Sequence, residues 1–313
     1  MQSRSALTTK VASAAYRSSA FLARNTPLSA GIVVAKAAVA TPKVSRKRRI
    51  LVRRNLERAL DRPLDSSEAT KRVGAVFEWY ARYHLESFKL PKLTASTVDA
   101  GFVCEDDDRK LIESHVRKGV GPILVLPHLG TWEWAAWWLA LIPKMKVTAV
   151  VEPLNNVKLF EWFQAFRNKL GIDVIPADPS AIGQLTAAVR KGHIVCLVSD
   201  RDISGGGTPT TFFGERTRLP TGPAVLALRT GAPLLPTAVY WHNNTRRAVI
   251  LPPVDIQRRD RFRADISRVV QDYAKALEQL ISLKPEQWHL MSPNWPSDYE
   301  ALNLPVPSSL KNL

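Results

Sequence analysis

Residues 121–142, GPILVLPHLGTWEWAAWWLALI, decide the fold. The continuous apolar run over 121–126 is typical of a strand that is buried on both faces of a parallel sheet. Gly130 permits a tight turn, and Thr131 is a good N-cap for the apolar, Trp-rich helix expected over 131–142. The stretch therefore predicts a strand, a turn and a helix in succession, which is the repeating unit of an α/β fold.

The turn carries a histidine and a carboxylate that suit general-base chemistry. His128 follows the strand, and Glu133 lies five positions later. An imidazole can take a proton from a hydroxyl near neutral pH, while a carboxylate holds its other ring nitrogen. No nucleophilic Ser or Cys is needed if the substrate supplies the hydroxyl. We therefore predict His128 and Glu133 as a catalytic pair, although the same spacing also arises incidentally.

Strand and helix patterns alternate from residue 121 onward. Strands are expected at 122–126, 147–151, 172–175, 193–198 and 233–241. Helices are expected at 131–142, 156–170, 179–190, 221–230 and 264–283. This alternation indicates an α/β fold with a mainly parallel central sheet flanked by helices. Active sites of such sheets lie at the carboxyl ends of the strands, and His128, Glu152 and Asp200 each follow a predicted strand.

The chain is strongly basic. It has 313 residues, and 44 Lys and Arg against 28 Asp and Glu give a net charge of +16. This balance implies an anionic partner, which is a nucleic acid, an anionic membrane or a phosphorylated ligand. The two cysteines, Cys104 and Cys196, show no disulfide or metal-ligand spacing, which predicts a reducing compartment and no metal site.

Residues 1–60 are predicted to form a basic, amphipathic helical arm. Residues 1–56 contain no Asp or Glu, a composition that organellar transit peptides share. A cluster of cations lies in this arm, at Arg46, Lys47, Arg48 and Arg49. It suits either a solvated helix face or anionic lipid headgroups, which attract each cation by about 1 kcal/mol. An apolar arm before a polybasic run favours a peripheral membrane protein, and a further helix is expected over 65–89.

Other charged and aromatic residues have both structural and functional interpretations. Arg167 can be a dipole partner in the last turn of its helix, a phosphate ligand, or a partner of Glu152. The sequence Asp200-Arg201-Asp202 suits buried ion pairing or a site at a strand end. In the following glycine-containing loop, Arg216 and Arg218 precede a helix N-terminus and can receive a phosphate or an oxyanion there.

Together these segments resemble one family, the bacterial acyltransferases that include lipid A biosynthesis late acyltransferases and actinobacterial phosphatidylinositol mannoside acyltransferases. The resemblance covers about residues 45–297. It rests on Arg53–Leu56, Tyr80–Phe88, His128-x4-Glu133, Glu152–Asn156, Arg167, Asp200–Asp202, Phe212–Gly214, Pro220–Pro223 and Pro285–Leu290. Glu152 and Trp288-His289-Leu290 are similar to the mannoside branch, which uses acyl-CoA.

The resemblance implies a glycerol-3-phosphate-acyltransferase-like fold, with a membrane-associating arm over 1–60, an acyltransferase domain over 61–300 and a tail over 301–313. It implies a peripheral protein on the cytoplasmic face of the bacterial inner membrane. The expected reaction moves an acyl chain from acyl-CoA to a mannose hydroxyl of phosphatidylinositol mannoside, without a cofactor or metal. His128 would act as base, oriented by Glu133.

The resemblance also implies a set of substrate-binding residues. Sugar and phosphate binding is expected from Glu152, Arg167, Asp200 and Arg201. Further substrate contacts are expected from Trp132, Phe212, Phe213, Arg216 and Arg218. The four tryptophans of the helix over 131–142 suit either core packing or the wall of an acyl groove beneath that helix.

Two alternatives remain open. A lipid A-type enzyme would take its acyl chain from an acyl carrier protein, whose acidic surface suits the positive charge. A non-enzymatic basic protein that binds nucleic acid or membranes would also explain the charge. The sequence contains no aromatic/basic RNA-binding signature, helix-turn-helix pattern or zinc knuckle, so a nucleic-acid partner is not expected.

Overall fold

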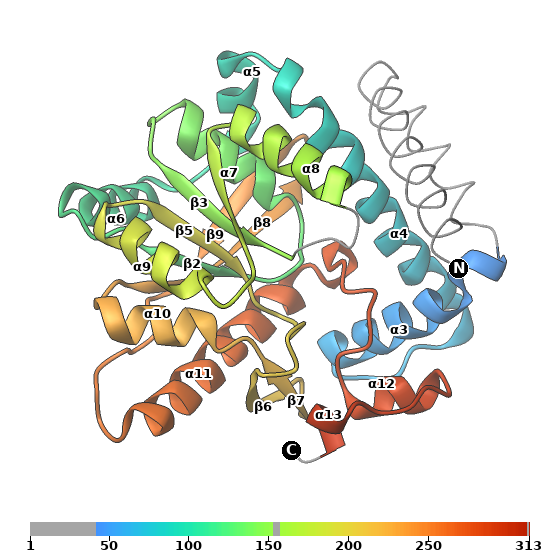
Figure 1. Ribbon diagram of the computed structural model, residues 1–313. Coiled ribbons are helices and arrows are strands. Elements are labelled where there is room, and N and C mark those ends of the chain that lie inside the picture. Colours follow the sequence, from blue (N-terminus) through green and yellow to red (C-terminus); the bar gives the residue numbers. More distant parts are fainter. Residues whose placement is uncertain (1–41, 153–156, 312) are drawn as a thin grey trace.

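A seven-stranded sheet forms the centre of the computed structural model, which describes residues 42–152, 157–311 and 313 (Figure 1). The order of its strands is β1 (Phe102–Val103), β9 (Thr245–Ile250), β8 (Leu234–His242), β2 (Ile123–Leu126), β5 (Ile194–Val198), β3 (Val147–Val151) and β4 (Ile172–Pro176). The run from β8 to β4 is parallel, and β9 is antiparallel to β8. The predicted mainly parallel sheet is thus confirmed.

Helices cover both faces of the sheet because its central strands are buried on both sides. On β2, Ile123 and Val125 face one core and Leu124 and Leu126 face the other. The first core includes α9 (Ala181–Arg190), α10 (Gly222–Thr230) and α11 (Phe262–Leu283). The second core includes α5 (Ala95–Ala100), α6 (Asp106–Arg117), α7 (Trp132–Leu141) and α8 (Val157–Lys169). This arrangement agrees with the continuous apolar runs that predicted the strands.

Two long helices open the part of the chain that the structure describes. They are α3 (Pro42–Leu60) and α4 (Ser66–Lys89), which pack against each other through a small apolar cluster. Asp65 caps α4 by accepting hydrogen bonds from the N–H groups of Ser67 and Glu68. A 3-10 turn over Leu90–Lys92 follows directly, as Pro91 favours. The predicted helices to about residue 60 and over 65–89 are confirmed. Residues 1–41 of the arm lie outside the described residues, and so do residues 153–156 of the Glu152–Asn156 motif.

Several short elements differ from the prediction. The loop after β5 contains a hairpin of β6 (Thr208–Phe212) and β7 (Glu215–Leu219), and the predicted tail contains α13 (Ser308–Lys311). The hairpin turns at Phe213 and Gly214, whose φ angles are +50° and +74°. Such a two-residue turn requires this left-handed backbone, and Gly214 adopts it without steric cost.

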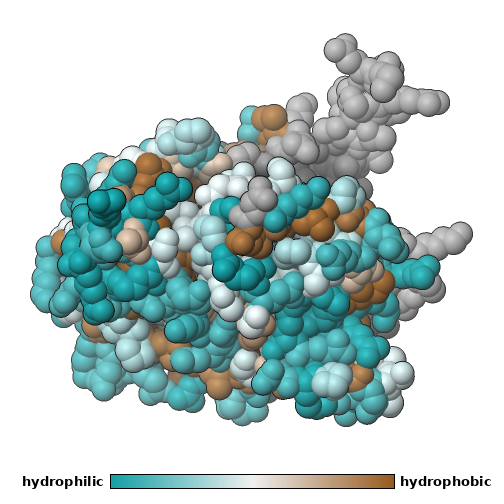
Figure 2. Space-filling view, turned by 90° about the horizontal axis from the view of Figure 1, so that it is seen from below, coloured by the Kyte–Doolittle hydropathy of each residue, from teal (hydrophilic) through white to brown (hydrophobic). Residues whose placement is uncertain are grey.

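The surface seen from below in Figure 2 is mostly hydrophilic, with hydrophobic residues scattered among charged and polar ones. Scattered apolar residues are normal on a solvated surface. Among the helices that the structure describes, none is long and apolar enough to cross a bilayer.

Candidate active site

His128 and Asp200 meet because of the register between two neighbouring parallel strands. Leu126 of β2 pairs with Val198 of β5, and each strand ends there. The second residue beyond each end is His128 on one strand and Asp200 on the other. Nδ1 of His128 lies 2.5 Å from Oδ1 of Asp200, and the backbone N–H of His128 donates to Oδ2 at 3.0 Å.

The carboxyl group of Asp200 is fully buried and ionised. The indole N–H of Trp288 donates to Oδ2 of Asp200 at 2.7 Å, and the side-chain amide of Asn294 donates to the backbone carbonyl of Asp200 at 3.0 Å. Burial alone would raise the pKa of Asp200, but the charge of His128 and the hydrogen bonds from His128 and Trp288 outweigh it. The pKa of Asp200 therefore lies below its ordinary value.

The imidazole of His128 is arranged as a base. Its side chain is 46% exposed, whereas that of Asp200 is 0% exposed. Nδ1 is hydrogen-bonded to Asp200, and within the described part of the chain no group bonds to Nε2. A carboxylate on Nδ1 favours the tautomer with the proton on that nitrogen, which leaves the lone pair of Nε2 available.

Glu133 has different partners, which corrects the prediction that it orients His128. It is buried in the first turn of α7, where Arg167 donates to it at 2.6 Å and the Ser87 hydroxyl at 2.8 Å. Burial would raise the pKa of Glu133, but the charge of Arg167 and hydrogen bonds from Tyr83, Arg167 and Ser87 lower it. The reason is geometric, since Glu133 faces α4 and α8 while Asp200 already holds Nδ1.

Two of the four predicted substrate-binding arginines, Arg167 and Arg201, are held by carboxylates, though not in the suggested combination. Arg167, in the last turn of α8, pairs with Glu133 rather than with Glu152. Its guanidinium carbon lies 5.5 Å from the ring centre of Trp132. Glu152 instead accepts from Arg201 at 3.1 Å. These side chains cross-link α7 to α8 and the end of β3 to the end of β5.

The four predicted substrate residues of the hairpin do not line the cavities beside His128, so their contact with substrate stays a prediction. Phe212 is fully buried and stacks on Trp295, and Phe213 lies 5.5 Å from the ring of Trp288. Arg218 donates to the carbonyls of Gly207 and Ser309, and Arg216 is exposed. The cause is the pleat of the hairpin, which points these side chains at the core, the C-terminal segment or solvent.

Two cavities adjoin His128. The larger has a volume of about 740 Å³ and is lined by residues after β3 and β5 and by apolar side chains of α8 and α9, such as Phe163 and Leu185. The smaller has a volume of about 320 Å³ and lies against α3 and α4. A third cavity, beneath α7, measures only about 30 Å³. Because that space is about the volume of one water molecule, it does not hold an acyl chain in this conformation.

Comparison with known proteins places the chain in a family. The family model described as bacterial lipid A biosynthesis acyltransferase matches residues 12–297. The chain belongs to this family.

Two named relatives are phosphatidylinositol mannoside acyltransferases. The protein from Mycobacterium tuberculosis H37Rv is 31% identical over 255 residues, which cover 79% of this chain and 77% of the relative. The protein from Mycolicibacterium smegmatis is 30% identical over 250 residues, covering 79% of each. The family resemblance predicted from the motifs is thus confirmed.

In this acyltransferase, a C-terminal segment that sequence reasoning did not assign to the site supports the turn that carries His128. The buried side chain of Gln287 bonds to both the N–H and the carbonyl of Trp241, at 2.8 and 2.9 Å. Its own carbonyl accepts from the N–H of Gly130, and the N–H of His289 donates to the carbonyl of His128. The Pro-Glu-Gln-Trp sequence is the signal for this support, and Trp288 within it reaches Asp200.

Gly130 is required by this close packing. Its φ is +63°, and a Cβ atom there would lie 1.7 Å from the carbonyl oxygen of Val239. No other residue fits that turn without moving β8.

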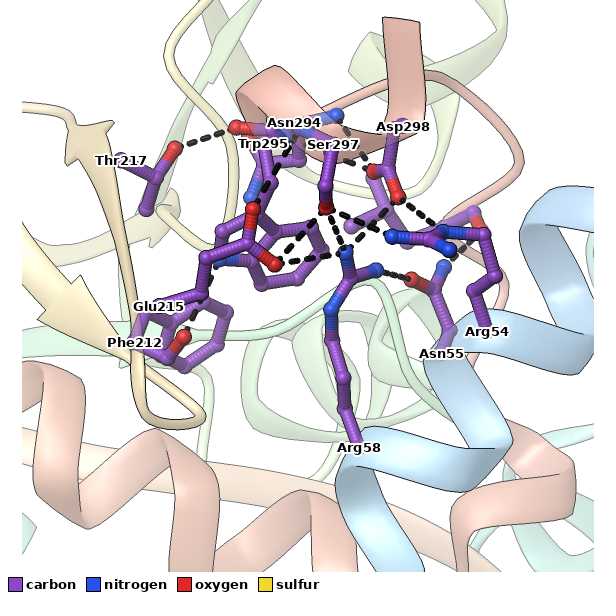
Figure 3. A network of polar contacts seen from close by, with 11 residues as sticks. Arg54, Asn55, Arg58, Phe212, Glu215, Thr217, Asn294, Trp295, Ser297 and Asp298 are labelled. Carbon is purple, nitrogen blue, oxygen red and sulfur yellow. Dashed lines mark hydrogen bonds and ion pairs between the residues drawn. The ribbon is translucent and has the colours of Figure 1, made fainter. Parts of the chain in front are cut away.

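A partly buried polar network joins α3 to the same C-terminal segment (Figure 3). Arg58 pairs with Asp298 at 2.8 Å and with Glu215 at 3.0 Å, and its guanidinium carbon lies 3.9 Å from the ring centre of Trp295. Asp298 also accepts from the N–H of Asn294. Because Asn294 bonds to Asp200, the network links α3 to the site.

The predicted membrane-binding cations have unequal positions on α3. Arg46, Lys47 and Arg48 are exposed, and Arg48 also lines the smaller cavity. Arg49 is half-buried, with its guanidinium carbon 5.5 Å from the ring centre of Phe77. As for metals, the described residues contain no group of three or more His, Cys, Asp or Glu side chains that could hold an ion.

Proposed function

We propose that this acyltransferase moves a fatty acyl chain from acyl-CoA to a mannose hydroxyl of a phosphatidylinositol mannoside. The observation that carries the chemistry is the buried Asp200 on Nδ1 of a half-exposed His128, beside a cavity of about 740 Å³. The relatives named phosphatidylinositol mannoside acyltransferase support the choice of acceptor.

The reaction begins with His128. Nε2 removes the proton from the acceptor hydroxyl as its oxygen attacks the thioester carbonyl carbon. The C–O bond forms, the tetrahedral oxyanion collapses, and the C–S bond breaks. The leaving thiolate then receives the proton from the imidazolium. General-base assistance of this kind is worth about 10²–10⁴-fold in rate.

Asp200 supports this step by position and by charge. Its carboxylate holds the imidazole in one tautomer and stabilises the imidazolium that forms. The buried hydrogen bonds from Trp288 and from the backbone of His128 keep Asp200 ionised. We assign the oxyanion to backbone N–H groups at the start of α7, because the first N–H groups of a helix have no partner within it.

The larger cavity suits the acyl chain. Its volume lies within the range usual for ligand pockets, and Val150, Phe160, Phe163 and Leu185 supply an apolar lining. Trp132 borders both cavities beside His128 and the small space beneath α7, which supports a position for it between acyl chain and acceptor. Glu152 and Arg201 lie at the rim of the same cavity and suit contacts with sugar hydroxyls.

We further propose that the protein works as a peripheral protein on the cytoplasmic face of the bacterial inner membrane. Arg46 and Lys47 are exposed cations on α3, and the whole chain has a net charge of +16. Cations near an anionic bilayer each contribute about 1 kcal/mol to adhesion.

The test is release of CoA from palmitoyl-CoA by the purified full chain, with mass spectrometry of the lipid product. It is run with phosphatidylinositol dimannoside, with a lipid A precursor, and without acceptor. Wild type is compared with His128→Ala and with His242→Ala, which removes an exposed histidine.

We expect mannoside-dependent release that His128→Ala abolishes and His242→Ala spares. Release with the lipid A precursor alone would keep the chemistry and overturn the acceptor. Activity only with an acyl carrier protein as donor would overturn the assignment of acyl-CoA.

A further inference from the structure

The smaller cavity beside His128 differs in chemistry from the larger one. Its volume is about 320 Å³, and it lies between α3, α4, the turn after β2 and residues 289–292. Its lining is mixed: beside apolar side chains such as Leu290 and Met291, it includes the polar and aromatic side chains of Arg48, Tyr80, His84, Arg201, His289 and Ser292. The larger cavity has a more apolar wall, to which Val150, Phe163 and Leu185 contribute. The two cavities share His128, so a molecule in each would meet at the same imidazole.

Several nitrogen atoms of this lining have no partner in the part of the chain that the structure describes. Nε of Arg201 and Nε2 of His289 are buried, and neither has a hydrogen-bond partner among the described residues. Arg48 is exposed, and no carboxylate within residues 42–152 and 157–311 pairs with it. Buried polar groups are nearly always satisfied, so unsatisfied groups around one cavity indicate a polar occupant.

The charge of the cavity comes from its arginines. Burial lowers the pKa of His84, and it lowers the pKa of His289 to about 3. Both imidazoles are therefore neutral at pH 7, and each can exchange a hydrogen bond with a hydroxyl. Tyr80 lies edge-on to both rings, with ring centres 4.6 and 5.7 Å away. Arginines with neutral hydroxyl-binding groups and aromatic rings suit a phosphorylated polyol.

We propose that this cavity binds the phosphorylated polyol headgroup of the acceptor lipid, with Arg48 on its phosphate. The inference rests on the proposed function, because an acceptor bound here would present a hydroxyl to His128 while the acyl chain occupies the larger cavity. The proposal gives Arg48 a role that differs from that of its neighbours Arg46 and Lys47, which are exposed but do not line the cavity.

The test uses two water-soluble acceptors below their critical micelle concentrations, so that membrane adhesion does not contribute. One is a short-chain phosphatidylinositol dimannoside, and the other is octyl mannoside, which lacks a phosphate. Arg48→Gln is compared with Lys71→Gln, which removes a positive charge from an exposed position on α4.

We expect Arg48→Gln to raise the KM for the phosphorylated acceptor by about 10-fold or more, the usual effect of losing a charge-assisted hydrogen bond. The KM values for octyl mannoside and palmitoyl-CoA, and kcat, should stay unchanged, as should every constant of Lys71→Gln. A rise in the KM for palmitoyl-CoA would assign Arg48 to the phosphates of CoA. Equal effects on both acceptors, or no effect, would also overturn the proposal.

A binding measurement keeps this inference separate from the proposed function. Calorimetric titration with inositol 1-phosphate requires no turnover. Wild type should bind it, and Arg48→Gln should bind it at least about 10-fold more weakly. If the wild-type protein transferred no acyl chain to any acceptor, only the proposed function would be overturned. If the wild-type protein failed to bind inositol 1-phosphate, the cavity assignment would be overturned.

Discussion

Asp200 and Glu133 are both buried carboxylates with lowered pKa values, yet they have opposite surroundings. Asp200 faces a titratable imidazole at a cavity, whereas Glu133 faces the permanent cation of Arg167 between helices. The first arrangement can gain and lose a proton on the histidine during a reaction. The second fixes a charge and joins α4, α7 and α8. The partner of a buried carboxylate therefore decides whether that carboxylate serves chemistry or structure.

The largest expected effect comes from Asp200→Asn. The amide NH₂ would donate to Nδ1 of His128, so that Nε2 carries the proton and cannot act as base. We expect kcat to fall by about 10³–10⁴-fold while the protein stays folded. Steady-state kinetics with palmitoyl-CoA and the mannoside acceptor measure this, with Asp173→Asn, an exposed strand carboxylate, as control. A loss of less than 10-fold would show that Asp200 does not support His128 as the base.

Glu133→Gln is expected to act mainly on stability. Breaking one side of a buried ion pair leaves Arg167 uncompensated, which costs about 3–5 kcal/mol of unfolding free energy. Replacing both partners, in Glu133→Gln with Arg167→Gln, should recover much of that loss. Urea unfolding measures both variants. A stable Glu133→Gln protein that is as inactive as Asp200→Asn would reverse the comparison between the two carboxylates.

Trp288→Phe sharpens the comparison by removing one donor from Asp200. The indole N–H bonds to Oδ2 at 2.7 Å, and a hydrogen bond to a charged group is worth about 1.5–3 kcal/mol. We expect kcat to fall by about 10–100-fold. Trp295→Phe is the matched control, because Trp295 is equally buried but donates to the carbonyl of Phe212. Equal losses of kcat in the two variants would indicate a packing effect.

The smallest effect concerns stability in acid. As the pH falls, protonation of Asp200 or Glu133 should not be the first event that lowers the free energy of unfolding. Both have lowered folded-state pKa values, so the stability they contribute is lost only as pH falls through those values. His289 is different, because its pKa falls from 6.5 to about 3 on folding. Below about pH 6.5 the unfolded chain binds a proton at His289 that the folded chain excludes, so this group alone should lower the unfolding free energy by about 1.4 kcal/mol at pH 5.5.

Urea unfolding between pH 7.5 and 5 checks this prediction. His289→Gln should flatten the curve over this range, and His242→Gln, an exposed histidine, should not. A curve for His289→Gln that is as steep as that of wild type would show that another group binds the proton.

The strands and long helices could be predicted because their apolar patterns are local. The predicted strand at 147–151 has the bounds of β3, and the strand end that places His128 was equally readable. The partner of His128 was not, because the order of strands in the sheet brings β5 next to β2 and no local pattern records that order. A spacing of five residues drew the prediction to Glu133 instead.

The hairpin and the C-terminal segment escaped prediction for the same reason. The side chains of Phe212 and Arg218 are placed by contacts with residues far along the chain, at Trp295 and Ser309. Trp288 is 88 residues from the aspartate that it holds. Their sequence signals were visible as part of the family pattern, but the pattern does not state which of its members support the site and which contact substrate.

The most direct test of the central claim is a double-mutant cycle on the rate of acyl transfer, measured in single turnovers by mass spectrometry. Asp200→Asn is made in wild type and in His128→Ala. If Asp200 acts through His128, it should cost about 10³-fold or more in wild type and almost nothing in His128→Ala, as residues that act as a unit do. A full additional loss in the His128→Ala background would contradict the account.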